Sequence, residues 1–223
     1  MNYSFWGVNL SEKGEMRAKV TQIISLLENV HPDAKLILNW SNPLELLIAA
    51  MLAAQFRDDV VNKVTENLFK KYKTAADYAN VNLEELENDI KAVRFYRAKA
   101  RNIREACRIL VEKYNGEVPR TMEELLSLPG VGRKTANIVL SNAFGIIEGI
   151  IVETHVSRVA RRLGLTDKTD PDEIERDLME IVPREKWLRF SDLLIFHGRR
   201  ICVARKPKCN ECVLSNLCPS ATL

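Results

Sequence analysis

Apolar side chains recur along this chain every three or four residues, which is the spacing of one face of an α-helix. The period is clearest at two sets of positions: Ile103, Cys107, Leu110 and Val111, and Ile174, Leu178 and Ile181. An apolar run from Leu46 to Ala54 follows Asn42, Pro43 and Glu45. Asn42 is a typical N-cap, Pro43 suits the first helical position, and Glu45 can complete a capping box. We therefore predict a buried helix here.

The segment 146–152 is the one stretch that could be taken for a β-strand, because most of its residues are the β-branched isoleucine and valine. Nothing nearby alternates in a way that would pair with it, and a lone strand is not stable. We interpret the segment as a connection. The pattern as a whole predicts an all-α protein.

Length and composition limit the class of protein. The chain has 223 residues, of which 46% are hydrophobic and 28% are charged, so it can form one or two globular domains. Its longest apolar run has nine residues, whereas a membrane-spanning helix needs roughly 20. Residues 1–20 lack the apolar segment of a signal peptide. We therefore expect no membrane association and a location in the cytoplasm.

Charge is distributed unevenly, although 33 basic and 30 acidic residues leave a formal net charge of only +3. One basic cluster contains Arg94, Arg97, Lys99, Arg101, Arg104 and Arg108. A second contains Arg199, Arg200, Arg205, Lys206 and Lys208. Such clusters are often no more than solvated surface, so they indicate nucleic acid only if another motif agrees.

The segment 123–144 predicts two helices joined by a tight turn. A first helix over 123–128 is followed by Pro129, Gly130, Val131 and Gly132, and a second helix is expected over 133–144. Glycines permit positive φ and close approach of a ligand, and the N–H groups that open the second helix favour an anion such as a phosphate. A plain corner between two helices is the alternative.

Two residues near this hairpin are candidates for chemistry. Lys134 lies in the first turn of the second helix, where the helix dipole disfavours an ammonium, and an uncharged lysine can form a Schiff base with a sugar aldehyde. Glu153 follows an apolar run at the expected start of another helix and could act as a general acid or base. From the residues alone, phosphate binding without reaction is the more frequent role of such a lysine, and Glu153 could equally well cap its helix.

Four of the five cysteines lie in the last 22 residues, with the spacing C-x6-C-x2-C-x5-C at Cys202, Cys209, Cys212 and Cys218. Four thiolates in so short a segment can surround one metal centre. The alternatives are a structural zinc ion and a 4Fe-4S cluster, and spacing alone favours zinc, because zinc sites with four thiolates are the commoner. Cys107 stands among apolar helical positions, which indicates a buried core thiol rather than a ligand.

Three features together resemble the endonuclease III family of helix-hairpin-helix DNA glycosylases: the string Leu-Pro-Gly-Val-Gly-Arg-Lys-Thr-Ala-Asn around Lys134, Val-Glu-Thr-His-Val around Glu153, and the terminal cysteines. The resemblance runs from about Pro43 to Cys218. It implies an all-α fold with a six-helix domain over 36–147, which contains the hairpin. It further implies an iron-sulfur cluster domain formed by both chain ends, 1–35 and 148–223.

The resemblance also implies roles for individual residues. The four cysteines would hold one 4Fe-4S cluster, Lys134 would attack C1′ of the damaged nucleotide, and Glu153 would assist. The family usually has Asp at the position of Glu153, and this chain has one extra residue before it. The implied DNA contacts are Gln55 and Phe95 as gap-filling residues, Arg94 and Arg97 beside them, Gly130, Val131 and Gly132 in the hairpin, and Arg205, Lys206 and Lys208 in the cluster loop.

By this resemblance the chain is expected to be a bifunctional DNA glycosylase and AP lyase of base excision repair. Its partner would be double-stranded DNA with damaged pyrimidines or abasic sites, and it would act as a cytoplasmic, nucleoid-associated monomer. A mismatch glycosylase for thymine or uracil is the nearest alternative. A DNA-binding iron-sulfur protein without catalytic activity is another, for which the replacement of Asp by Glu153 is the main support.

Overall fold

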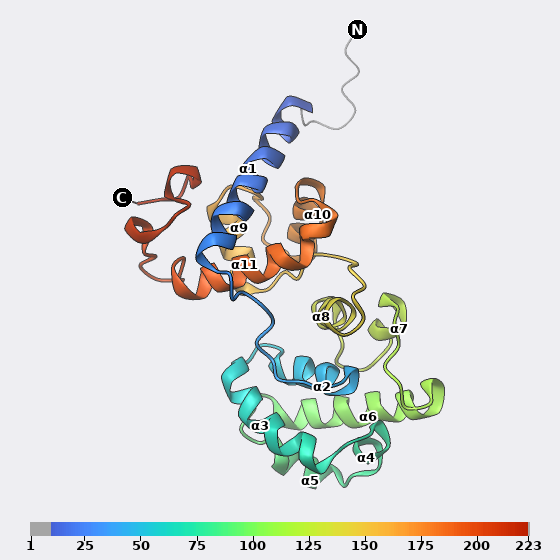
Figure 1. Ribbon diagram of the computed structural model, residues 1–223. Coiled ribbons are helices and arrows are strands. Elements are labelled where there is room, and N and C mark those ends of the chain that lie inside the picture. The colour runs from blue at the N-terminus through green and yellow to red at the C-terminus, as the bar shows by residue number, and fades with distance from the viewer. Residues whose placement is uncertain (1–9, 223) are drawn as a thin grey trace. The chain divides into compact units, whose positions relative to one another are not determined.

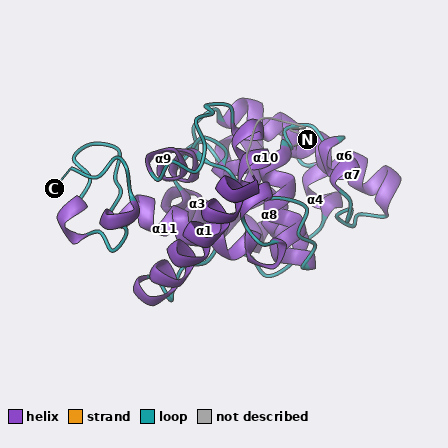
Figure 2. Ribbon diagram, turned by 90° about the horizontal axis from the view of Figure 1, so that it is seen from above, coloured by secondary structure: helices purple, strands orange, loops and turns teal. Residues whose placement is uncertain are grey.

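The computed structural model describes residues 10–222, so part of the N-terminal segment on which the signal-peptide expectation rests lies outside the described residues. Helices joined by loops and turns make up this part of the chain, and it contains no strand (Figure 2). The predicted all-α class is confirmed. The α-helices are α1 (Leu10–Val30), α2 (Pro43–Ala53), α3 (Asp58–Lys71), α4 (Ala75–Asn80), α5 (Leu83–Asp89), α6 (Tyr96–Tyr114), α7 (Met122–Leu126), α8 (Arg133–Phe144), α9 (Thr154–Arg162), α10 (Pro171–Ile181) and α11 (Trp187–Arg200).

Three single-turn 3₁₀ helices complete the description: η1 (Arg184–Lys186), η2 (Cys209–Glu211) and η3 (Ser215–Leu217). The chain divides into two compact units. One consists of Leu36–Glu148, and the other combines the residues up to Lys35 with Gly149–Leu223 (Figure 1). Within the described residues no helix is both long and apolar enough to cross a membrane.

The unit Leu36–Glu148 is built around α2, whose residues from Leu46 to Ala53 are all buried. α2 packs against α3, α6 and α8, while α4 and α5 cover another part of α6 (Figure 1). Asn42 caps α2, because its side-chain oxygen accepts the N–H of Glu45 at 3.0 Å. The expected reciprocal bond differs: the Glu45 carboxylate accepts from the N–H and hydroxyl of Ser41, both at 2.7 Å, and not from Asn42.

Helix α6 carries the amphipathic pattern that the sequence predicts. Ile103, Cys107 and Leu110 are buried, and burial raises the pKa of the Cys107 thiol to about 12, as befits a core residue. Val111 departs from the expected apolar face, since its side chain is exposed. Val111 directly follows the buried Leu110 in the helix, so its side chain points away from the core.

The other unit packs α1 against α10 and α11, and α9 against α11 (Figure 1). Ile174, Leu178 and Ile181 of α10 are buried, as their spacing predicts. The segment 146–152 is an irregular connection, which confirms the interpretation made from the sequence. Its last residues are nevertheless fixed, because Ile150, Ile151 and Val152 are buried and the Ile151 N–H donates to the Ser191 hydroxyl at 2.9 Å. This connection leads directly into Glu153 and α9.

Candidate functional site

The helix-hairpin-helix motif consists of α7, a turn and α8. α8 spans Arg133–Phe144, the same bounds that the sequence predicts, whereas α7 ends at Leu126, two residues early. Gly130 has φ of +78°, and a Cβ built on it would lie 2.7 Å from Nδ2 of Asn102 on α6. Both its conformation and its surroundings therefore require glycine.

Gly132 has a different role from the one expected for a turn glycine. Its φ of −98° is open to any residue, and a Cβ there would meet nothing within 4 Å. It is the N-cap of α8 and, being glycine, forms no side-chain cap bond. The N-terminus of a helix carries the positive end of its dipole and N–H groups that point outward, so the start of α8 suits the binding of a phosphate.

Replacement of the two hairpin glycines is expected to give unequal results. Gly130→Ala should lower the free energy of unfolding by about 1–3 kcal/mol, because it adds a strained φ and a contact with Asn102. Gly132→Ala should change it by less than about 0.5 kcal/mol, since neither penalty applies. Denaturant titration of both variants checks this, and equal losses would contradict the account of the turn.

Lys134 is the second residue of α8, and its side chain is exposed. The amine can therefore be reached by a substrate as large as DNA. Burial therefore does not add to the effect of the helix dipole on this lysine.

Glu153 is the N-cap of α9 and is half-buried. Its Oε1 accepts the N–H of His155 at 2.6 Å and that of Val156 at 3.1 Å. The capping alternative raised from the sequence is thus correct as a structural description. It does not exclude chemistry, because both bonds use Oε1 and Oε2 takes no part in them.

The two residues expected to fill the gap in DNA occupy exposed turns at helix ends. Gln55 follows the C-terminal residues of α2 with φ of +54°, and Phe95 precedes α6 with φ of +59°. The Phe95 side chain is 53% exposed, and the Arg94 guanidinium lies 4.5 Å from its ring centroid. Arg97 is also exposed and forms a long ion pair of 3.8 Å with Glu87. Left-handed backbone is uncommon outside glycine, so both turns are unusual and aim a side chain outward.

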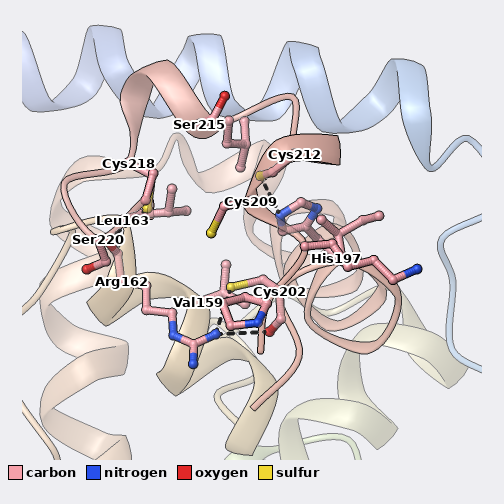
Figure 3. A pocket seen from close by; sticks show the side chains of 15 residues that line it. Val159, Arg162, Leu163, His197, Cys202, Cys209, Cys212, Ser215, Cys218 and Ser220 are labelled. Carbon is pink, nitrogen blue, oxygen red and sulfur yellow. Dashed lines mark hydrogen bonds between the residues drawn. The ribbon is translucent and has the colours of Figure 1, made fainter. Parts of the chain in front are cut away.

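All four terminal cysteines line one cavity, which Figure 3 shows with their sulfur atoms in view. None of them forms a disulfide. Arg162 Nη1 donates to Cys202 Sγ at 3.2 Å, and the Thr222 hydroxyl lies 3.8 Å from Cys209 Sγ. Across residues 10–222 no three His, Cys, Asp or Glu side chains converge on a position for a single metal ion. Four thiols around a common cavity, with cationic and polar donors beside them, fit an iron-sulfur cluster.

A chain of hydrogen bonds leads from the surface to Cys212. Arg200 pairs with Asp33 at 2.6 Å and approaches His31 Nδ1 at 3.5 Å, and His31 Nε2 lies 3.3 Å from His197 Nδ1. His197 Nε2 in turn lies 3.4 Å from Cys212 Sγ, the contact that Figure 3 shows. Burial, with a smaller effect from His31, lowers the pKa of His197 to about 4, so its imidazole is neutral. Because Arg200 can only donate, each imidazole is assigned Nε2–H, and the chain ends with donation to the sulfur.

Two arginines connect α9, the helix that Glu153 caps, to the segment 202–218 that carries the four cysteines, here called the cluster loop. Arg158 donates to the carbonyls of Cys202 at 3.1 Å and Gly198 at 2.9 Å. Arg162 donates to the carbonyl of Val203 at 2.8 Å and to that of Ala204 at 3.0 Å. α9 can approach α11 closely because Gly198 has no side chain; a Cβ there would lie 2.9 Å from that of His155. The middle and the C-terminal end of α9 are therefore held in part by the cluster loop.

The cluster loop presents Arg205, Lys206 and Lys208 as exposed side chains. Lys206 has φ of +53°, and Lys208 lies 3.8 Å from Glu211. The loop thus carries a local positive charge into solvent, as expected for a backbone contact with DNA.

The structure brings together the four cysteines, and it sets the turns of Gln55 and Phe95 and the hairpin on one unit. Lys134 belongs to the unit Leu36–Glu148, and Glu153 belongs to the other. Four residues that contact these sites could not be assigned from the sequence. Arg162, His31 and His197 lie at the cysteines, and Lys99 bonds to the backbone just before Gln55. The string His197-Gly198-Arg199 before the first cysteine was the signal available for His197, and Lys99 gave none, because it stands among other basic residues.

Comparison with known proteins identifies the class of protein. Residues 48–184 match the HhH-GPD superfamily of base excision DNA repair proteins, and residues 202–218 match the iron-sulfur binding domain of endonuclease III. The chain is 50% identical to endonuclease III of Synechocystis sp. over 212 residues, which cover 95% of this chain and 97% of that protein. It is 42% identical to endonuclease III of Escherichia coli strain K12, over 91% of this chain and 95% of the relative.

Solved structures agree with these relatives. The structure of a non-covalent endonuclease III–DNA complex superimposes with a TM-score of 0.88 at 48% identity, covering 92% of this chain and 96% of that one. A trapped endonuclease III–DNA covalent intermediate gives the same values. A thermostable thymine-DNA glycosylase has a TM-score of 0.80 at 27% identity, over 93% and 97% of the two chains.

The chain therefore belongs to the endonuclease III family of the HhH-GPD superfamily, and it is a DNA glycosylase with lyase activity in base excision repair. It binds DNA and carries an iron-sulfur cluster.

Proposed function

We propose that this enzyme removes oxidised or ring-damaged pyrimidines from duplex DNA and then cleaves the strand 3′ to the abasic site by β-elimination. The observation that carries the proposal is Lys134, an exposed amine in the first turn of α8, beside a hairpin that leads into a helix N-terminus, a position that suits a phosphate. The hairpin would hold the DNA backbone while the neighbouring amine reaches the sugar.

The Lys134 amine would attack C1′ of the damaged nucleotide. The glycosidic bond breaks, the base leaves with a proton, and the sugar ring opens to give a Schiff base between C1′ and the lysine nitrogen. Loss of a proton from C2′ then expels the 3′ phosphate, and water releases the lysine. Such a Schiff base is reduced by borohydride to a stable protein–DNA adduct, which makes the pathway observable.

Glu153 would be the carboxylate that assists base loss and accepts the proton in the elimination. Its Oε1 bonds to the first N–H groups of α9 hold the side chain in one orientation and leave Oε2 for this role. The side chain is one methylene longer than the family's usual Asp. The extra residue in the connection before it, where 150–152 are buried, provides the backbone shift that places a longer side chain.

Substitution of Glu153 tests this assignment. Glu153→Gln should reduce base release by on the order of 100-fold, because the amide can still cap α9 but cannot accept a proton. Glu153→Asp should reduce it by a similar factor, since a shorter side chain on a backbone adapted to Glu misplaces the carboxylate by ~1 Å. Single-turnover base release measures both. Unchanged activity in Glu153→Gln would refute the role, and a strong gain in Glu153→Asp would refute the adaptation.

Gln55 and Phe95 would fill the space left by the extruded nucleotide and hold the orphaned base, with Arg94 and Arg97 on nearby phosphates. Their exposure and their left-handed turns support this role. The hairpin residues Gly130, Val131 and Gly132 and the loop cations Arg205, Lys206 and Lys208 would bind the backbone.

The cluster would be of the 4Fe-4S type, held by Cys202, Cys209, Cys212 and Cys218, with a structural role in fixing the basic loop and α9. Purified protein should then be brown and contain about four irons per chain. A colourless protein with bound zinc would contradict this part of the proposal.

The two compact units would correspond to a helix-hairpin-helix domain and a cluster domain formed by both chain ends. Because one chain supplies Lys134, Glu153 and all four cysteines, the enzyme is proposed to act as a monomer. Its proposed location is the cytoplasm, where it would work on the nucleoid.

Incubation with three duplexes tests the substrate class: one holds thymine glycol, one a G·T mismatch and one an abasic site, each with and without borohydride. Release of thymine glycol together with trapping supports the proposal. The similarity to a thymine-DNA glycosylase makes mismatch activity the second candidate. Preferred release of thymine opposite guanine would establish that candidate, and absence of any base release would overturn both.

A further inference from the structure

Lys99 is a buried lysine for which the proposed chemistry has no use. It lies on α6, is only 9% exposed, and donates from Nζ to the carbonyls of Leu52 at 2.6 Å and Ala54 at 2.7 Å. The sequence placed it in an exposed basic cluster, and the structure contradicts that placement. Burial lowers its pKa to about 8. Its amine is engaged and enclosed, so it cannot compete with Lys134 for a sugar.

The carbonyls that Lys99 contacts belong to the C-terminal end of α2, directly before Gln55. The last carbonyls of a helix lack partners within the helix and carry its negative dipole end, which an ammonium satisfies. The chain then turns through Gln55 with φ of +54°, a conformation that is strained for a residue other than glycine. Lys99 is therefore the side chain that holds the base of the Gln55 turn.

The same residue is bonded to the second turn. The Lys99 N–H donates to the carbonyl of Phe95 at 3.1 Å, and Phe95 is the N-cap of α6 in a left-handed conformation. One turn further along α6, Asn102 lies against Gly130 of the hairpin. Residues 95, 99 and 102 are spaced to share one face of the helix. One face of α6 therefore contacts the Gln55 turn and the hairpin, and the Phe95 turn leads into the same face. These are three of the segments proposed to touch DNA.

We propose that Lys99 is a positioning residue that sets the distance between Gln55 and Phe95, so that both side chains can enter the gap left by an extruded nucleotide. The proposal rests on the gap-filling role given to these two residues above. A buried ammonium is expensive in free energy and a hydrophobic residue would suffice for packing, so the two carbonyl contacts are what distinguish lysine at this position. An error of about 1 Å in such a site lowers a rate on the order of 100-fold.

The test uses the full chain and a duplex with a tetrahydrofuran abasic analogue opposite 2-aminopurine, whose fluorescence rises when the orphaned base is unstacked. This measurement needs no catalysis, so it remains informative even if the proposed substrate class is wrong. Wild-type protein at saturation should raise the fluorescence, and Lys99→Met should lose most of that rise while still binding the duplex. Lys99→Arg, which keeps a donor for each of the two carbonyls, should recover part of the fluorescence rise. The control Lys113→Met, which removes an exposed lysine of the same helix, should behave as wild type.

Catalysis gives a second readout. Lys99→Met should reduce base release from a damaged duplex about 100-fold, but reduce borohydride trapping on a preformed abasic site by less than about fivefold, because an abasic sugar is extruded at little cost. Lys99→Gln gives the same comparison if the methionine variant folds poorly. In a protein that already carries Gln55→Ala and Phe95→Ala, adding Lys99→Met should cause almost no further loss of base release, because Lys99 is proposed to act through those two side chains. Equal losses of both activities, full additivity, or a normal fluorescence rise would each overturn the proposal.

Discussion

Lys134→Gln is expected to abolish strand cleavage at abasic sites, with a loss of at least about 1000-fold in the single-turnover rate. The amide cannot form a Schiff base, and removing a covalent nucleophile is among the most damaging changes to an enzyme. Binding to a duplex with an abasic analogue should weaken only modestly, because the hairpin and its N–H groups remain. Gel assays of cleavage and of binding on the same duplex separate the two effects.

Lys113→Gln is the matched control for this substitution. It removes an exposed lysine from the same unit, in the last turn of α6, and should leave both cleavage and binding near wild type. If Lys134→Gln cleaved an abasic duplex at the wild-type rate, the assignment of the nucleophile would be wrong.

Cys212→Ser is expected to remove the iron-sulfur cluster and to destabilise its unit. In residues 202–222 the only helices are two single-turn 3₁₀ helices, and the only buried side chain is that of Leu214. This segment therefore has little hydrophobic core of its own. A loss of about 4 kcal/mol would lower the melting temperature by roughly 10 °C. Visible absorption and iron content should fall in the same variant, as measured by spectroscopy and a colorimetric iron assay.

Cys107→Ala provides the control for loss of a thiol. Cys107 lies in the core of the other unit and touches no part of the cluster cavity, so its variant should keep the colour and the iron. Base excision should fall in Cys212→Ser because Arg158 and Arg162 connect the loop to the helix that Glu153 caps. A colourless Cys212→Ser protein with unchanged stability and activity would contradict the structural role.

Local signals were sufficient for much of the fold. The bounds of α8 follow from Gly132 before it and Gly145 after it, and the start of α2 follows from Asn42 and Pro43. These predictions succeed because caps and turns depend on residues a few positions apart. Periodicity likewise places most of the buried face of α6 and α10, with Val111 as the exception.

Long-range contacts were beyond this kind of reasoning. Lys99 stands in a run of arginines, and only the position of the α2 carbonyls, 45 and 47 residues earlier, makes it a buried contact. His31 joins the chain of donors to Cys212 through His197, 166 residues away. The sequence also left Glu153 as either a cap or a functional carboxylate. The structure shows the capping bonds of Oε1, in which Oε2 takes no part, and the functional role stays a prediction.

The most direct test of the mechanism is to locate the covalent bond to DNA. The wild-type enzyme is trapped with borohydride on a damaged duplex, digested, and analysed by peptide mass spectrometry. The sugar remnant is predicted to lie on the peptide containing Lys134, and on that lysine alone. An adduct on Lys99, on another amine, or the absence of any adduct during efficient base release would contradict the account.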